Sequence, residues 1–292
     1  MATRTKAATA IGAVLLTLGL ASTTTLQAWG GQGHRLVALV AANHLSPLAK
    51  QNVAWLLGTQ SLADVSSWAD QQVTDHAQTS WWHYLNIPPN AAGYDRDRDC
   101  PRQPGVAAGT RGDTWRDCVV DRISYFEQRI GDTRLDRADR ATALKFLVHF
   151  IGDLHQPFHA LGVERGGNGV LVRVFGEANC SNDPSRPSPC NLHAVWDSRL
   201  IAHRNLDDAK YVALLERLRA SKRWDQRPPG TPPEWAMESW ALAKKALVAQ
   251  NTNIDEAYYQ AQIPVIEERL ALAGVRLAVV LNRAFLSAPP TD

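Results

Sequence analysis

Pairs of histidine and aspartate at helical spacing are the residues best placed to carry out chemistry in this sequence. The chain contains nine histidines. His149 and Asp153 lie four positions apart in a strongly helical stretch, and His193 and Asp197 repeat this H-x-x-x-D spacing after Asn191, a suitable helix cap. Residues four apart project from one face of an α-helix, so each pair can offer a nitrogen and an oxygen to one cation. One pair is a weak indication because histidine is also a routine structural residue, whereas two pairs favour a metal site.

The segment that contains the first pair is dense in possible ligands. It reads H-F-I-G-D-L-H-Q-P-F-H over residues 149–159. Because Pro157 cannot donate a helical hydrogen bond, the helix should end near Gln156, and the chain can then turn His159 back toward the same site. His155 lies roughly 240° around the helix from the first histidine. We therefore expect His155 to have a structural or supporting role.

Further donors precede this segment. Asp70 follows Trp68-Ala, and His83 stands in the run W-H-Y-L-N over residues 82–86. Taken alone, these motifs would indicate core tryptophans and a turn carboxylate. Cleavage after Ala28 would make Trp29 the first residue, followed by G-G-Q-G and His34. A free α-amine and its own carbonyl oxygen can chelate a metal ion that the histidine also reaches, since glycines permit the tight backbone path; a flexible N-terminal tail is the alternative.

The N-terminal residues have the pattern of a secretory signal. Arg4 and Lys6 precede an apolar run over residues 7–21, which is shorter than the roughly 20 residues needed to span a bilayer. Residues 1–28 are therefore predicted to be a signal peptide, with a membrane anchor as the alternative. The sequence predicts one domain over 29–288 and a short tail over 289–292.

The charge balance argues against a basic nucleic-acid-binding face. The formal charge of the chain is +2. Removing Arg4 and Lys6 leaves 29 basic residues against 29 acidic ones. A protein that holds duplex phosphates with a basic face normally has an excess of positive charge. Any phosphate chemistry should therefore depend on local charge, which metal ions can supply.

Four cysteines, an even number, indicate disulfides in an exported protein. Three connectivities are possible for four cysteines. We expect local pairing, Cys100 with Cys118 and Cys180 with Cys190, because each pair brackets a loop rich in Pro, Gly, Asp and Arg; the other connectivities stay open. No close C-x-x-C pair is present, so a zinc site built on cysteine is not indicated.

Helical periodicity dominates the elements that must position these residues. Apolar residues recur at helical spacing over residues 34–45, 121–130, 138–154 and 265–286. Residues 169–175 alternate like a strand and predict a small hairpin. Irregular structure is expected over residues 88–116, 176–191 and 227–233. The sequence predicts a single all-α domain with long disulfide-held loops and a small β-hairpin.

In order, these motifs resemble the zinc-dependent nuclease family typified by the fungal single-strand nucleases S-one and P-one. The shared motifs are Trp at the expected mature start, W-A-D, H-Y-x-N, H-F-x-G-D-x-H-Q-P-x-H, G-G-N and N-L-H-x-x-W-D. The resemblance extends to the last predicted helix and implies an all-α fold with three zinc ions. It implies three ligand sets: Asp70, His83, His149 and Asp153; the Trp29 amine and carbonyl with His34 and a bridging Asp153; and His159, His193 and Asp197.

The resemblance also implies an activity. Members of the family use zinc-activated hydroxide to cleave single-stranded RNA and DNA to 5′-phosphorylated products, and many also remove 3′-phosphates from nucleotides. Zinc lowers the pKa of a bound water to about 7 and stabilises charge on phosphate. We expect a secreted or periplasmic monomer that has neither a membrane anchor after signal removal nor a stable protein partner.

The nucleotide-binding positions follow from the same resemblance. Gly166-Gly167-Asn168 resembles the base-binding segment, in which Asn168 would hydrogen-bond a base edge, and Tyr84 stands where the family has a stacking aromatic. Arg165 stands where fungal members have an apolar pocket wall. The glycines also suit a hairpin turn, and both interpretations can hold together.

Two positions depart from the fungal pattern. Fungal members carry Arg where Val73 stands and Asp where Asn86 stands, a pair implied to orient the attacking water. Asn86 can hydrogen-bond but cannot act as a base. Asp153 and Asn86 are the residues that we expect to take part in catalysis. Three alternatives stay open: a zinc-dependent phospholipase C, whose last ligand pair ends in Glu rather than Asp197; a non-catalytic secreted zinc-binding domain; and a relative that has lost hydrolysis through these two substitutions.

Overall fold

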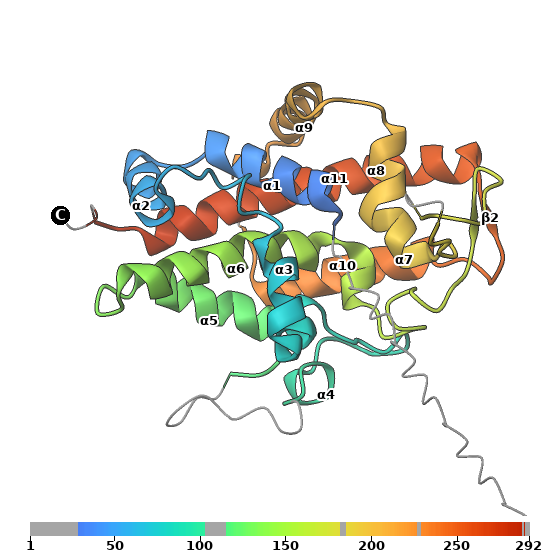
Figure 1. Cartoon of the computed structure of the whole chain (residues 1–292), viewed down its shortest axis with the longest axis horizontal. Coiled ribbons are helices and arrows are strands. Elements are labelled where there is room, and N and C mark those ends of the chain that lie inside the picture. Colours follow the sequence, from blue (N-terminus) through green and yellow to red (C-terminus); the bar gives the residue numbers. More distant parts are fainter. Residues whose placement is uncertain (1–28, 103–114, 182–184, 227–228, 288, 290–292) are drawn as a thin grey trace, which may run out of the picture.

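The computed structural model describes residues 29–102, 115–181, 185–226, 229–287 and 289. The expected signal peptide, residues 1–28, lies outside the described residues, as does most of the expected tail over 289–292. Helices account for nearly all regular structure in the described part of the chain (Figure 1). The predicted all-α class is confirmed.

Four helices correspond to the predicted periodic segments. They are α1 (Gly31–Asn43), α5 (Val119–Gly131), α6 (Arg137–His155) and α11 (Glu256–Ala284). The last of these begins earlier than predicted and continues through Pro264. Proline removes a helical hydrogen bond, but Ile263 and Ile266 on either side are buried in the core. Tertiary packing therefore keeps this helix continuous where the local signal indicates a start.

Shorter helices connect this frame. They are α2 (Pro47–Leu57), α3 (Trp68–Asp75), α4 (Arg96–Asp99), α7 (Leu192–Ala194), α8 (Leu200–His203), α9 (Asp208–Lys222) and α10 (Pro232–Ala246). Tight turns of helix are η1 (Ala77–His83), η2 (Pro157–Ala160), η3 (Val195–Arg199) and η4 (Trp224–Gln226). The helix α4 forms inside a stretch that was expected to be irregular, because the Asp95 side chain accepts from the backbone N–H groups of Asp97 and Arg98.

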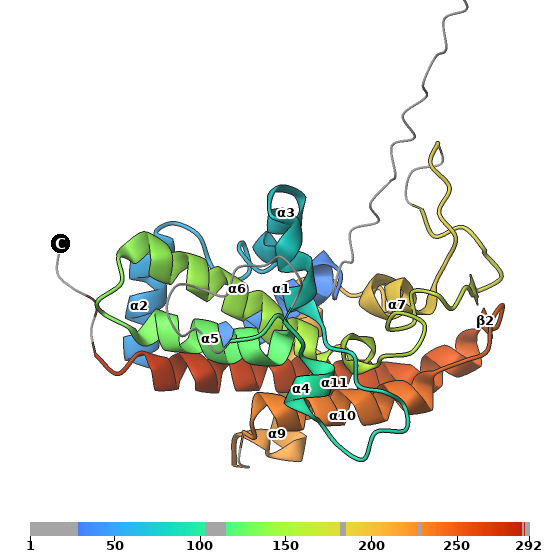
Figure 2. The same cartoon turned by 90° about the horizontal axis from the view of Figure 1, so that it is seen from below.

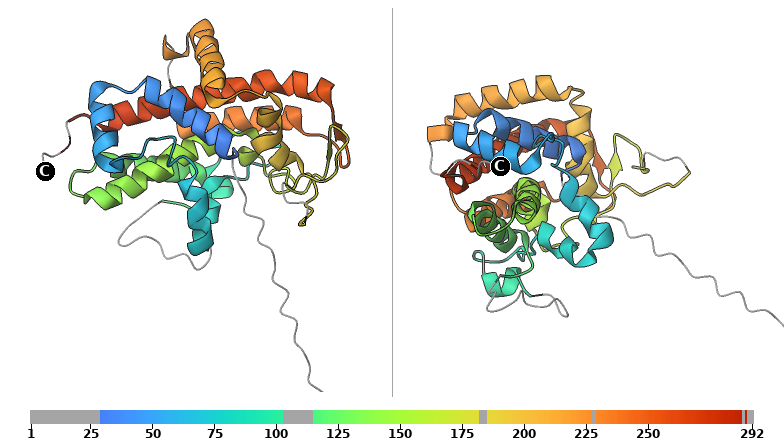
Figure 3. Two further views of the ribbon diagram at one scale, coloured as in Figure 1. Left: turned by 45° about the horizontal axis from the view of Figure 1, so that its top comes forward. Right: turned by 60° about the vertical axis from the view of Figure 1, so that its left-hand side comes forward.

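The helices pack around one continuous apolar core. Helix α11 runs the length of the molecule and packs against α1, α6 and α9, while α5 packs along α6 (Figures 1 and 2). Helix α9 lies across the outer side of α1 and α11 (Figure 3). Helices α7 and α8 stand beside the beginning of α1. The beginning of α1 and the end of α6 are thereby brought close to α3 and α7.

The ends of α6 are defined by local chemistry. Asp136 caps the helix, since its side chain accepts a hydrogen bond from the N–H of Asp139. The helix ends at His155, next to the cap residue Gln156 and before Pro157, as predicted. Among the described residues, no helix has both the length and the apolar character needed to cross a membrane.

The small sheet joins the predicted hairpin to a second strand that was not predicted. Strand β1 (Arg173–Val174) pairs in parallel with strand β2 (Asn253–Ile254), which lies far along the chain. After β1 the chain turns back and Val174 bridges Glu177, but Arg173 donates its backbone N–H to Thr252. Val174 and Glu177 exchange both of their backbone hydrogen bonds, so the predicted hairpin is present as a tight turn at the end of β1. The pairing of β1 with β2 was not predicted. Alternation along one strand does not specify its partner, and the signal over residues 253–254 is too short to recognise.

Two disulfides close the long loops. Cys100 pairs with Cys118, and Cys180 pairs with Cys190. This confirms the expected local connectivity. Disulfides persist in oxidising compartments, so both bridges fit an extracellular protein.

Gly274 determines how closely α11 approaches α1. A Cβ at this position would lie 2.5 Å from Cγ1 of Val40 and 3.0 Å from the carbonyl oxygen of Val37. We expect Gly274→Ala to lower the free energy of unfolding by about 1–3 kcal/mol through overpacking, despite the better helix propensity of alanine. Thermal unfolding measures the loss as roughly 2–4 °C per kcal/mol. Gly93→Ala is the control because no atom lies within 4 Å of its added Cβ, and a Gly274→Ala protein as stable as the wild type would contradict this packing.

Candidate metal centre

All eight side chains predicted to bind metal come together where α1, α3, α6 and α7 meet. The structure groups them as His34, His149 and Asp153; as Asp70, His83 and His149; and as His159, His193 and Asp197. Within each group the donor atoms lie within 4.8 Å of one another. A fourth group joins Cys100 and Cys118 to Asp121, but these sulfurs form a disulfide and are not thiolate ligands.

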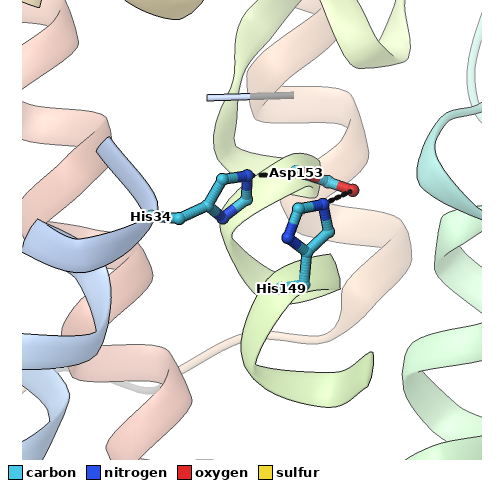
Figure 4. A group of neighbouring side chains, drawn as sticks. All are labelled: His34, His149 and Asp153. Carbon is cyan, nitrogen blue, oxygen red and sulfur yellow. Dashed lines mark ion pairs between the residues drawn. The ribbon is translucent and has the colours of Figure 1, made fainter. Parts of the chain in front are cut away.

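Asp153 lies between His34 and His149 (Figure 4). Its Oδ1 lies 3.3 Å from Nε2 of His34, and its Oδ2 lies 3.0 Å from Nδ1 of His83. The same Oδ2 lies 3.3 Å from Nε2 of His149, one helical turn earlier on α6. The two oxygens of one carboxylate thus face donors on different sides, which is the arrangement that a bridging ligand needs.

His149 belongs to two groups, which the spacing along the chain did not indicate. Its Nδ1 lies 2.7 Å from the carbonyl oxygen of Ser66. A carbonyl can only accept, so this nitrogen carries the hydrogen and Nε2 faces inward. Nε2 lies 3.3 Å from Oδ1 of Asp70, and the His149 ring stacks on the His34 ring with centroids 3.9 Å apart. His149 therefore belongs to both of the first two groups, whereas the sequence assigned it to only one ligand set.

The third group has the same design. His159 Nδ1 donates to the carbonyl oxygen of His83 at 2.8 Å, and His193 Nδ1 donates to that of Gly166 at 2.6 Å. Both Nε2 atoms consequently present lone pairs, and they face each other at 3.1 Å. Oδ2 of Asp197 lies 3.5 Å from Nε2 of His193. Two nitrogens on one tetrahedral zinc are roughly 3.3 Å apart, from bonds of roughly 2.0–2.1 Å, so the spacing fits a cation.

The buried donors fit a metal ion better than they fit one another. Several of their atoms are buried without a hydrogen-bond partner: both ring nitrogens of His34, Oδ1 of Asp70, Nε2 of His83, Nε2 of His149 and Oδ1 of Asp153. Buried polar atoms are normally paired, because leaving one unpaired costs about 1–3 kcal/mol. Nitrogen and carboxylate oxygen are also the donors that zinc prefers.

Burial shapes the protonation of the group. It lowers the pKa of His34, His83 and His159 well below the ordinary value and so favours the neutral, metal-binding ring. It also lowers the pKa of His193 to about 4. Burial raises the pKa of both Asp153 and Asp197, because carboxylate charge is costly away from water. A bound cation would offset that cost and restore the ionised form.

His149 is the exception among the histidines. Burial lowers its pKa, but the carboxylates of Asp153 and Asp70 outweigh burial and raise that pKa to about 9. The two carboxylates therefore favour positive charge at this position.

Trp29, the expected first residue of the mature chain, lies at this centre. Its side chain is fully buried. A Cβ at Gly152 would lie 2.7 Å from Nδ1 of His34 and 3.8 Å from Cδ1 of Trp29, so these residues adjoin one another. The backbone N–H of Gly30 donates to the carbonyl of Asp197 at 2.7 Å. The start of the domain is thereby fixed against the third group.

The residues predicted to bind nucleotide lie on two segments that run side by side. The backbone N–H of Leu85 donates to the carbonyl of His159 at 2.9 Å, which places Tyr84 and Asn86 next to that metal group. Asn86 is exposed beside Gly162. Tyr84 is half-buried, and burial raises its pKa to about 12, so the phenol stays neutral.

Arg165, Gly167 and Asn168 belong to a left-handed turn. The residues Glu164, Arg165, Gly166 and Gly167 have φ values of 47°, 55°, 63° and 81°. Arg165 is exposed. Asn168 Nδ2 donates to the carbonyl of Arg165 at 3.0 Å, so its amide supports the turn as well as facing the surface. At Gly166 a Cβ would lie 2.5 Å from the carbonyl oxygen of Phe158, which only glycine avoids.

Sequence reasoning missed the groups that orient the ligands. Gln156 is buried, and its Nε2 donates to Oδ1 of Asp197 at 2.6 Å. The carbonyls of Ser66 and Gly166 were also missed, because every residue carries such a group. His155 has the expected supporting position: its ring accepts from Arg276 and donates to the carbonyl of Ile151.

These features define a helical protein with a candidate multi-metal centre of histidine and aspartate. The family described as S1/P1 Nuclease matches residues 29–286, and the chain belongs to this family. Nuclease P1 of Penicillium citrinum is 31% identical over 285 residues, which cover 87% of this chain and 97% of that protein. Nuclease S1 of Aspergillus oryzae is 31% identical, with 91% and 94% covered. Endonuclease 1 of Arabidopsis thaliana is 30% identical, with 98% and 96% covered.

A substitution at Gly152 can test whether metal binding requires the observed position of the His34 ring. An added methyl would lie 2.7 Å from Nδ1 of His34, so Gly152→Ala should push that ring away from Asp153. Alanine favours the helix, and we therefore expect the fold to persist. Metal affinity should fall by about 10- to 100-fold, the range for loss of a group that orients a ligand. Elemental analysis during chelator titration measures it, with Gly93→Ala as the control; unchanged affinity would exclude His34 from the centre.

Proposed function

We propose that this protein is a three-zinc endonuclease that cleaves single-stranded RNA and DNA to 5′-phosphorylated products and also acts on 3′-nucleotides. One observation carries the proposal: three adjoining groups of buried histidine and aspartate donors, several of them without partners, in a member of a nuclease family. Its similarity to Nuclease P1 and Endonuclease 1 supports the same class of substrate.

The proposed work of the protein side chains is to hold and orient. Asp153 would bridge two ions through its separate oxygens, supported by the distances to His34 and His83. The Trp29 amine and carbonyl would complete the set around His34. When bound, zinc would supply a water of lowered pKa and stabilise charge on the phosphate and the leaving oxygen.

Asn86 is proposed to orient the attacking water by hydrogen bonding. It lies exposed on the segment that follows His83 and cannot remove a proton as a carboxylate would. Val73, on α3, offers no charge to help it. We therefore infer that proton removal depends on the metal ions more than on this side chain.

Nucleotide recognition is assigned to the two segments beside the third group. Tyr84 would stack on a base, an interaction worth roughly 1–3 kcal/mol that tolerates any base. Asn168 and Arg165 would contact the base edge or its phosphate from the left-handed turn, with Gly167 leaving room for the approach. A splayed single strand reaches such a site more readily than a stacked duplex does.

The proposed setting is outside the cytoplasm. Residues 1–28 have the pattern of a signal peptide, and the two disulfides fit an oxidising compartment. We propose a secreted or periplasmic monomer without a stable protein partner.

The first test is hydrolysis of single-stranded RNA and DNA by the mature protein, with chelator and with zinc added back. We expect chelation to abolish release of 5′-mononucleotides and zinc to restore it, because the donors alone lack the charge to stabilise the reaction. Hydrolysis of phosphatidylcholine is measured in parallel. Cleavage of the lipid alone would identify a phospholipase C, and no cleavage of any substrate would indicate a relative that has lost hydrolysis or one with a narrower substrate. A metal titration that shows a single zinc held entirely by protein donors would indicate a non-catalytic zinc-binding domain.

The N-terminal amine is tested by one extra residue before Trp29. The Trp29 side chain is fully buried, and Gly30 is hydrogen-bonded at 2.7 Å, so the start of the chain has no room to shift. We expect the extension to lower zinc affinity and nuclease activity by about 10- to 100-fold. The control carries the same residue at the C-terminus. Full activity of the extended protein would rule out the amine as a ligand.

A further inference from the structure

Two neighbouring tryptophans in η1 point in opposite directions. Trp82 is half-buried and packs against the core: its Nε1 donates to Oδ1 of Asp117 at 2.9 Å, its ring meets Phe146 edge-on at 5.6 Å, and the Arg122 guanidinium lies 4.2 Å from its centre. Trp81 points outward with 39% of its surface exposed, the most of any tryptophan in the described part of the chain. The anchoring of Trp82 fixes the direction of Trp81.

Trp81 shares an aromatic surface with Tyr84. The two ring centres lie 5.9 Å apart, and the rings are tilted by 43°. Tyr84 directly follows His83, one of the buried donors of the metal centre. The surface therefore begins beside the metal centre and extends outward along η1.

We propose that Trp81 stacks on a second nucleobase of a single-stranded substrate, next to the base on Tyr84. The inference rests on the proposed function. Successive bases in a stacked strand are roughly 3.4 Å apart, so two rings 5.9 Å apart and tilted match bases that have separated from each other. A duplex cannot present its bases in this way. The proposal thus adds a reason for single-strand preference that lies outside the metal centre.

The surroundings of Trp81 suit a nucleic acid. The segment η1 reads A-Q-T-S-W-W-H and contains no acidic residue, so it does not repel a phosphate backbone. A single exposed apolar residue is ordinary on a protein surface. Here the exposed ring is large, anchored through its neighbour and joined to a second aromatic ring. A stiff ring loses little conformational entropy on stacking, and base stacking needs this property.

Phe175 supplies a matched comparison. It is exposed to 38%, almost the same as Trp81, but one face is already covered by the His203 ring at 4.0 Å. Phe175 directly follows β1, whereas Tyr84 directly follows His83 in the candidate metal centre. Phe175→Ala therefore removes a similar exposed aromatic surface without touching the proposed strand path.

The test is equilibrium binding of zinc-loaded mature protein to two phosphorothioate hexamers that resist hydrolysis. One carries six thymines, and the other has the same backbone without bases. We expect Trp81→Ala to weaken binding of the base-bearing hexamer by about 5- to 150-fold, from roughly 1–3 kcal/mol per stacked base. Binding of the abasic hexamer should keep its wild-type affinity. Trp81→Phe should retain most of the affinity for bases, and Trp81→Leu should resemble Trp81→Ala.

Each result separates this inference from the proposed function. Equal affinity of Trp81→Ala and wild type for the base-bearing hexamer would overturn the stacking role, as would equal losses on both hexamers or a loss with Phe175→Ala. Thermal unfolding confirms that each variant is folded. Hydrolysis of an ordinary thymine hexamer by wild type is measured in parallel, so a failure of nuclease activity is recognised independently of the binding data.

Discussion

The structure depends on burying a group of electron-pair donors that do not satisfy one another. His34, His83, His149 and Asp153 are almost completely removed from water, and several of their atoms have no hydrogen-bond partner. Backbone carbonyl groups fix the ring hydrogens of His149, His159 and His193 at Nδ1, so their Nε2 lone pairs face the inner side. Such an arrangement is costly without positive charge at its centre. The scaffold must therefore supply the stability that the centre lacks, and a bound cation would offset the cost.

The long helices supply this stability and fix the helix ends that carry the donors. The donors sit at the beginning of α1, the end of α6 and the short helices beside them, while α11 supports α1 and α6 along their length. Gly152 and Gly274 let the helices approach, since a methyl at either would collide with α1. Close packing at these glycines thus lets the apolar core determine the positions of the candidate ligands.

Much of this could be predicted from residue type and spacing. Helical periodicity located α1, α5 and α6, and the paired H-x-x-x-D spacing located ligands, because both depend on the helical repeat. Sequence patterns did not predict features that depend on contacts between distant parts of the chain. The β1 strand pairs with residues 253–254 as well as forming its hairpin turn, and α11 passes through Pro264 because its neighbours are buried. The sharing of His149 between two groups depends on how α3 meets α6, which spacing along one chain segment does not encode.

Backbone groups were the least predictable parts of the centre, and one of them links the candidate metal ligand His193 to the turn that is proposed to contact nucleotide. Gly166 accepts the hydrogen bond that fixes the ring of His193, and it also lies in the left-handed turn that carries Arg165 and Asn168. Its φ of 63° and the 2.5 Å approach of Phe158 to a would-be Cβ restrict this position to glycine. Movement of the turn would therefore move the carbonyl that holds His193. In the proposed function, recognition of a base and orientation of a metal ligand would consequently depend on one segment, and a change that affects one would alter the other.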